Sequence, residues 1–80
     1  MATADAFRRF YEEVLAMARE GISAEIIADK IRRAIPDRDS RKQLIGHLRD
    51  SQNAFETEGK EEAAATLEHV IELLERSDTT

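Results

Sequence analysis

Cysteine is absent from this sequence of 80 residues, and proline and glycine are scarce, with one and three residues respectively. The missing cysteine excludes disulfide bonds, thiolate chemistry and cysteine-ligated zinc sites. With so little proline and glycine, long helices can continue without a break. No glycine-rich phosphate-binding loop is present either, so the sequence gives no support to a nucleotide-binding enzyme of that class.

Long apolar runs are also missing. No stretch of the sequence approaches the roughly 20 apolar residues that a membrane-spanning helix requires. The amino-terminal segment contains Asp5, Glu12 and Glu13, whereas a secretory signal has an apolar centre at this position. We therefore expect a cytoplasmic protein that does not bind membranes.

Apolar residues recur along most of the chain at spacings of three and four, the period of an α-helix. They do not alternate with polar residues, so no β-strand is expected. The pattern predicts helices over about residues 4–20, 24–34, 41–58 and 61–76, with frayed tails at 1–3 and 77–80. Because each apolar stripe must leave water, we predict one all-α domain over residues 1–80, a compact antiparallel bundle of four short amphipathic helices.

Polar residues mark where each helix is expected to begin. Thr3 or Asp5 can cap the first helix, and Ser23 can cap the second. Ser40, followed three residues later by Gln43, fits a capping box at the start of the third helix.

Three residues are expected to end helices. Gly21 and Gly59 fit the left-handed position that follows a helix. Pro36 ends the second helix, because the residue before a proline is displaced from the helical region.

Charge is sorted by sign along the chain. The net charge is −5 overall, and it is −3 over residues 1–29, +5 over 30–49 and −7 over 50–80. The total disfavours non-specific binding of nucleic acid, whereas the segregation favours recognition of a charged partner. The predicted acidic surface for a basic partner protein consists of Glu56, Glu58, Glu61, Glu62, Glu68 and Glu72.

The first predicted helix has an unusually wide apolar face. Its centre is formed by Phe7, Phe10, Tyr11 and Val14. A helix that is apolar this far round can bury one side within the monomer and another side against a partner. We therefore predict a contact surface here for a partner protein, and homodimerisation through the same face remains an alternative.

The basic segment supports a second hypothesis. Residues 20–31 have the sequence EGISAEIIADKI, in which Gly21 and Ser23 precede an Ile-Ala-containing helix. This stretch resembles the first half of the helix-turn-helix of bacterial regulators, and the resemblance implies that the next helix contacts DNA. The alternative nucleic-acid-binding residues are Arg32, Arg33, Arg38, Arg41 and Lys42. An equally simple interpretation is that this basic segment faces the acidic fourth helix of the same molecule.

Candidate catalytic and metal-binding groups form no recognisable motif. His47 flanks an apolar stripe and His69 lies opposite one, and neither has the spacing of a metal-binding helix. The many carboxylates are expected on solvated helix faces, since a chain of this length leaves little interior for a catalytic pocket. We expect no enzyme activity and no cofactor. The leading hypothesis is a small regulator, inhibitor or adaptor that binds another protein, and the sequence leaves the partner, the process and the oligomeric state open.

Overall fold

A computed structural model describes residues 2–79 of the chain. It contains four helices and, over these residues, no strand: α1 (Ala2–Arg19), α2 (Ala24–Ala34), α3 (Arg38–Thr57) and α4 (Glu61–Thr79). The prediction of an all-α bundle of four amphipathic helices is therefore confirmed.

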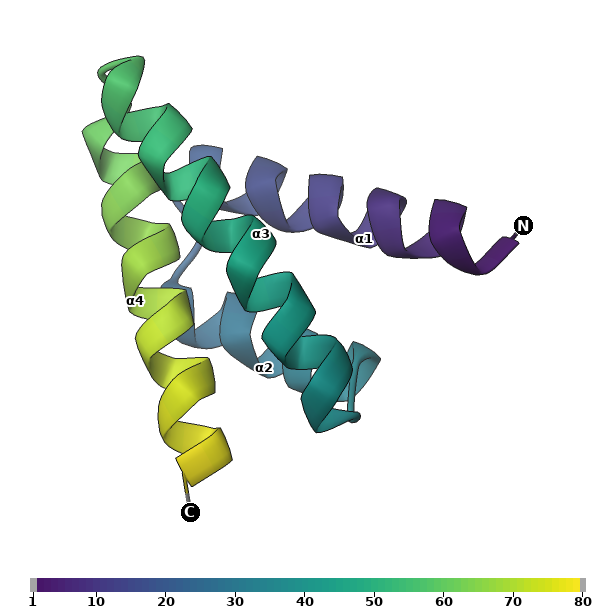
Figure 1. The fold of residues 1–80 in the computed structure, drawn as a ribbon. Helices are drawn as coiled ribbons and strands as arrows, with labels where there is room; N and C mark the ends of the chain where they lie inside the picture. Colours follow the sequence, from purple (N-terminus) through teal and green to yellow (C-terminus); the bar gives the residue numbers. More distant parts are fainter. Residues whose placement is uncertain (1, 80) are drawn as a thin grey trace.

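The helices are arranged as two antiparallel pairs that cross one another. α3 and α4 form a hairpin, and α1 and α2 run across it (Figure 1). The molecule measures 33 × 32 × 19 Å along its principal axes, so its thin dimension corresponds to about two helix diameters. α4 contacts each of the other three helices, which makes it the centre of the fold.

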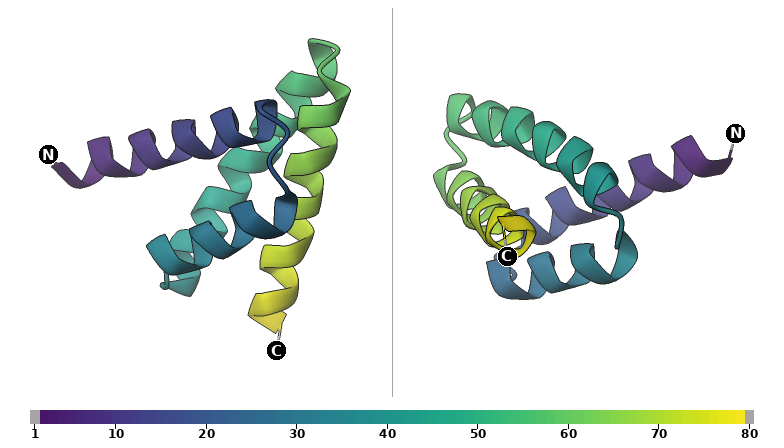
Figure 2. Two further views of the ribbon diagram at one scale, coloured as in Figure 1. Left: turned by 180° about the vertical axis from the view of Figure 1, so that it is seen from behind. Right: turned by 60° about the horizontal axis from the view of Figure 1, so that its bottom comes forward.

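The core is entirely apolar within the described residues. α4 contributes the largest share of it, including the fully buried Leu67, Val70 and Leu74, and α2 and α3 add Ile27, Ile31, Leu44 and Leu48. Over residues 6–19 of α1, two side chains are buried, Val14 and Ala18. The amino-terminal half of α1 extends past the other helices in both views of Figure 2.

Gly21 and Gly59 end their helices as predicted, with φ angles of 80° and 82°. The amide of Ile22 donates to the carbonyl of Met17 (3.1 Å), and that of Lys60 donates to Phe55 (2.8 Å). Each is the six-to-one hydrogen bond of a Schellman motif, which requires a left-handed residue after the helix. The left-handed backbone conformation therefore explains why glycine occupies both positions.

The start of α3 differs from the predicted one. The helix begins at Arg38 instead of Arg41, and its N-cap is Asp37 instead of Ser40. The Asp37 carboxylate accepts from the Ser40 amide (3.0 Å) and the Ser40 hydroxyl (2.9 Å). A carboxylate also interacts favourably with the positive end of the helix dipole, so the acidic cap wins over the serine three residues later.

The outer helix ends also extend further than predicted. Residues 2–3 belong to α1 and residues 77–79 to α4, so Thr3 and Asp5 lie inside the first helix instead of preceding it. Met1 and Thr80, which were assigned to the frayed tails, lie outside the described residues. Ser23 does occupy the N-cap of α2, but its hydroxyl donates to the Glu25 carboxylate (2.8 Å) instead of capping a backbone amide.

Candidate interaction surfaces

The crossing of α1 and α3 is formed by aromatic and polar side chains. The Tyr11 hydroxyl donates to the carbonyl oxygen of His47 (3.1 Å) and is hydrogen-bonded to the Ser51 hydroxyl. The imidazole of His47 lies near the rings of Phe7 and Tyr11, with centroids 5.9 and 5.7 Å apart. This cluster holds the middle of α1 against α3.

The predicted apolar face of α1 divides into accessible and inaccessible residues. Phe7, Phe10 and Tyr11 pack against the core and remain partly exposed. Val14 has no exposed surface, so it belongs to the core and cannot contact a partner in this structure. The accessible part of the face is therefore these three aromatic residues, which we call the α1 aromatic patch.

The predicted acidic surface falls into two groups. Glu56, Glu58, Glu61 and Glu62 surround the turn between α3 and α4. Lys60 lies in the same turn, where it forms an ion pair with Glu58 (3.3 Å). A depression of about 480 Å³ beside this turn is lined by Arg19 and Lys60 as well as by Glu61 and Glu62. Cations thus partly balance this end of the acidic surface.

The second acidic group lies in a groove between α3 and α4. Glu68 and Glu72 line this groove of about 260 Å³ together with Arg49, Gln52, Ile71 and Glu75. Arg49 forms an ion pair with Glu75. Our prediction omitted Arg49 and Glu75 from the acidic region. Helical spacing could have placed Glu75 beside Glu68 and Glu72, but the pairing with Arg49 depends on the packing of two helices.

Three of the five candidate nucleic-acid-binding residues form contacts within the chain. Arg32 donates to the Ser77 hydroxyl (2.8 Å), and Arg33 pairs with Asp29 (3.1 Å). Arg41 is half-buried and donates to the carbonyl oxygens of Ile35 (3.1 Å) and Pro36 (2.9 Å), which secures the end of α2.

Arg38 and Lys42 complete that set, and both are exposed on the first turns of α3. Neither side chain forms a hydrogen bond or an ion pair within the described part of the chain. They are therefore the two candidate cations that the fold leaves available.

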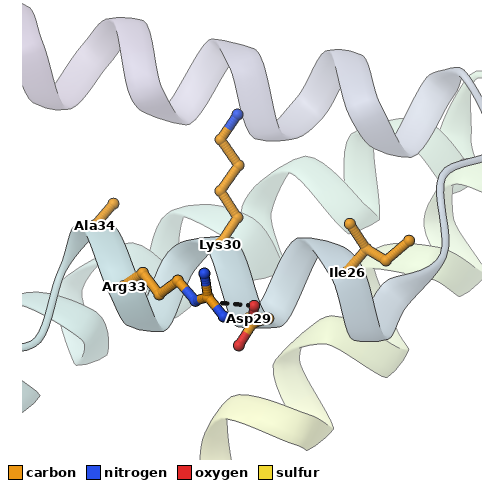
Figure 3. Close-up of a pocket in the computed structure, with 5 residues that line it drawn as sticks. All are labelled: Ile26, Asp29, Lys30, Arg33 and Ala34. Carbon is orange, nitrogen blue, oxygen red and sulfur yellow. Dashed lines mark ion pairs between the residues drawn. The ribbon is translucent and has the colours of Figure 1, made fainter.

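A further depression lies on the outer side of α2 (Figure 3). It has a volume of about 410 Å³ and is lined by Ile26, Asp29, Lys30, Arg33 and Ala34, which we call the α2 groove. Ile26 is 60% exposed and is the one large hydrophobic side chain in the described residues with such exposure. Lys30 extends toward α1, where its ammonium forms an ion pair with Glu13. Apolar spacing along residues 24–34 would place Ile26 with the buried isoleucines of α2, so the sequence gives no sign of this groove.

Hydrogen bonds at two helix starts lower the pKa of a carboxyl group. Hydrogen bonds from the Ser40 amide and hydroxyl lower the pKa of Asp37, and the Ser23 hydroxyl lowers the pKa of Glu25. Within the described residues, no group of three or more histidine and carboxylate side chains is arranged to hold a metal ion. Over the same residues, no helix has the length and apolar character that crossing a membrane requires.

Comparisons of the chain with protein-family models, with curated proteins and with solved structures found no match.

Proposed function

We propose that this protein is a non-enzymatic interaction module, a small regulator, inhibitor or adaptor that binds a partner protein. The α1 aromatic patch carries this proposal. Phe7, Phe10 and Tyr11 keep exposed surface on a helix whose amino-terminal half extends beyond the bundle. Aromatic side chains supply much of the binding energy where proteins meet, so three of them on one projecting helix favour an interface.

The glutamates would select the partner. Glu61, Glu62, Glu68 and Glu72 are exposed on α4, and their side chains form no ion pair or hydrogen bond within the described residues. Exposed charges of one sign raise the association rate with an oppositely charged surface and disfavour other partners. A partner with a basic surface beside an apolar pocket fits this combination.

The experiment is affinity capture from the source organism, followed by mass spectrometry and by titration of the captured protein. The triple variant Glu61→Lys, Glu62→Lys, Glu68→Lys should keep the helical circular dichroism spectrum and bind the partner at least about tenfold more weakly. The matched control reverses three other exposed carboxylates, Glu12, Glu20 and Asp50, and changes the net charge equally. If both triple variants weaken partner binding equally, or if neither weakens it, the acidic surface does not select the partner.

A second candidate is binding of nucleic acid, which the unpaired cations Arg38 and Lys42 favour. Contacts to phosphates release counterions, so affinity must fall steeply as salt rises. Fluorescence polarisation with a labelled duplex at two salt concentrations tests this function. The double variant Arg38→Glu, Lys42→Glu should abolish any binding, and absence of binding at low salt would exclude this candidate.

A second copy of the chain could also cover the α1 aromatic patch. Sedimentation distinguishes this alternative, because a monomer has a mass of 9.1 kDa. A species of twice that mass that Phe10→Ala returns to the monomer would assign the patch to self-association.

A further inference from the structure

We propose that the α2 groove is a second docking surface and that it binds an amphipathic helix carrying carboxylates. The groove lies on α2, apart from the acidic surface on α4. The acidic surface would bind a basic partner, whereas the groove would bind an acidic one. A module with both surfaces can join two partners. The inference adds to the proposed function and does not depend on the α1 aromatic patch.

The apolar part of the groove indicates a protein partner. Single exposed apolar side chains are common on protein surfaces and need no explanation by themselves. Ile26, however, borders a depression of about 410 Å³ whose other end contains the small apolar side chain of Ala34. Figure 3 shows these two side chains on the same side of α2 as Lys30. An apolar side chain inserted beside Ile26 would remove the surface of both from water.

The charged part of the groove indicates carboxylates. Lys30 and Arg33 line it, and their side chains are 44% and 82% exposed. Their partners in the free protein, Glu13 and Asp29, are each 53% exposed. Ion pairs this open to solvent contribute little to stability, so both cations can pair with a ligand at small cost.

The residues that line the groove carry an excess of positive charge. Lys30 and Arg33 outnumber the one carboxylate among them, Asp29, in a chain whose net charge is −5. The excess of positive charge here favours an acidic ligand.

The spacing along α2 defines the ligand further. Lys30 and Arg33 follow Ile26 by four and seven residues, which corresponds to about 6 and 10 Å along the helix axis. A ligand helix packed alongside α2 would therefore present one apolar side chain with carboxylates about four and seven residues away. That pattern describes one face of an acidic amphipathic helix.

The test uses a fluorescein-labelled amphipathic helical peptide with leucine at position i and glutamate at i+4 and i+7. A matched peptide has lysine in place of glutamate. Anisotropy titrations with the full chain should show binding of the glutamate peptide at least about tenfold tighter than binding of the lysine peptide. Ile26→Ala should weaken binding of the glutamate peptide about fivefold or more. The double variant Lys30→Glu, Arg33→Glu should reverse the preference between the two peptides.

Lys42→Glu is the control, since it removes an exposed cation on α3 and should leave peptide binding unchanged. Circular dichroism checks each variant, and Ile26→Ala alters no buried side chain. Three results would overturn the proposal: no peptide binding, equal affinity for both peptides, or affinity that does not respond to Ile26→Ala. Binding of a labelled nucleic acid that Lys30→Glu, Arg33→Glu abolishes and Ile26→Ala spares would assign the groove to nucleic acid. The triple variant Glu61→Lys, Glu62→Lys, Glu68→Lys should still bind the glutamate peptide. The test of the α2 groove can therefore fail while the acidic surface holds, and the reverse.

Discussion

The three glycines differ in backbone conformation, so replacement by alanine should have opposite effects at different positions. Gly46 lies within α3 with an ordinary helical conformation, whereas Gly59 has a φ of 82°. A Cβ atom would meet nothing within 4 Å at either position. Gly46→Ala should therefore stabilise the protein by about 0.5–1 kcal/mol, and Gly59→Ala should destabilise it by about 1–2 kcal/mol. Urea unfolding followed by circular dichroism measures both.

Gly21→Ala serves as a replicate of the Gly59 variant, because Gly21 has a φ of 80° and equally open surroundings. A stabilising effect at Gly59 or Gly21 would mean that these turns do not need a left-handed residue.

Asp37 caps α3 through its charge, so its contribution should depend on pH. The hydrogen bonds from Ser40 lower the pKa of Asp37 below its ordinary value of 3.8 in the folded protein. A carboxyl whose folded pKa is lowered stabilises the fold above its unfolded pKa, and this stability is lost as the pH falls through the folded pKa. Asp37→Ala should therefore lower the melting temperature at neutral pH, and the difference from the parent should shrink below about pH 4.

Asp39→Ala is the matched control, because Asp39 lies inside the first turn of α3 and does not cap it. If Asp37→Ala lowers the melting temperature equally at neutral pH and well below pH 4, the charged cap is not the cause.

At the scale of the helices, α1 has the fewest buried side chains among the residues whose burial the structure describes, and the Tyr11 cluster attaches it to α3. Tyr11→Phe removes the hydrogen bonds to His47 and Ser51 while keeping the ring. We expect a loss of about 0.5–1.5 kcal/mol in stability. Amide exchange in α1 should accelerate more than exchange in α4, because the lost hydrogen bonds join α1 to α3 and do not involve α4.

Ser51→Ala provides the control for this prediction, since it removes one of the two hydrogen-bond partners and should have a smaller effect of the same kind. Equal acceleration of exchange in every helix would show that α1 does not open separately.

The existence of each helix followed from apolar periodicity, whereas some helix ends did not. Gly21 and Gly59 were predictable because a left-handed residue after a helix has a strong glycine preference. The start of α3 was not, because Asp37 and Ser40 are both good caps and three residues separate them. The choice between them depends on where the chain leaves Pro36, which Arg41 helps to fix through the carbonyls of Ile35 and Pro36.

At the scale of the whole molecule, α4 connects the two layers, since it contacts α1, α2 and α3. Leu67 on α4 is fully buried, and Leu73 on the same helix is only partly buried. Leu67→Ala should cost about 2–5 kcal/mol, and Leu73→Ala should cost clearly less. A domain of this size has only about 4–12 kcal/mol of stability in total. Because Leu67→Ala would remove a large part of this stability, unfolding of the variant should be measured by urea titration at low temperature, where it is still folded at the start.

Unfolding of the Leu67 variant should be a single transition at all probes, because the side chain lies in the one core that the four helices share. A variant that loses α1 and α2 while α3 and α4 remain folded would contradict this view of α4.

The candidate surfaces were less predictable than the fold, for a physical reason. Helical spacing identifies which residues share a face, so the exposure of the α4 glutamates could be foreseen. It does not give the angle at which helices cross. The pairing of Arg49 with Glu75, the engagement of Arg41 and the exposure of Ile26 all depend on that angle. The same is true of Val14, which is buried in the core that α1 shares with the other helices.

The position of Tyr11 has a practical consequence. The chain contains one tyrosine and no tryptophan, and that tyrosine lies where α1 meets α3, with its hydroxyl bonded to a backbone carbonyl. The intrinsic fluorescence of the protein therefore comes almost wholly from Tyr11, at the contact between α1 and α3. Detachment of α1, whether spontaneous or caused by a ligand, can be followed in unlabelled protein by the spectroscopy of this one chromophore.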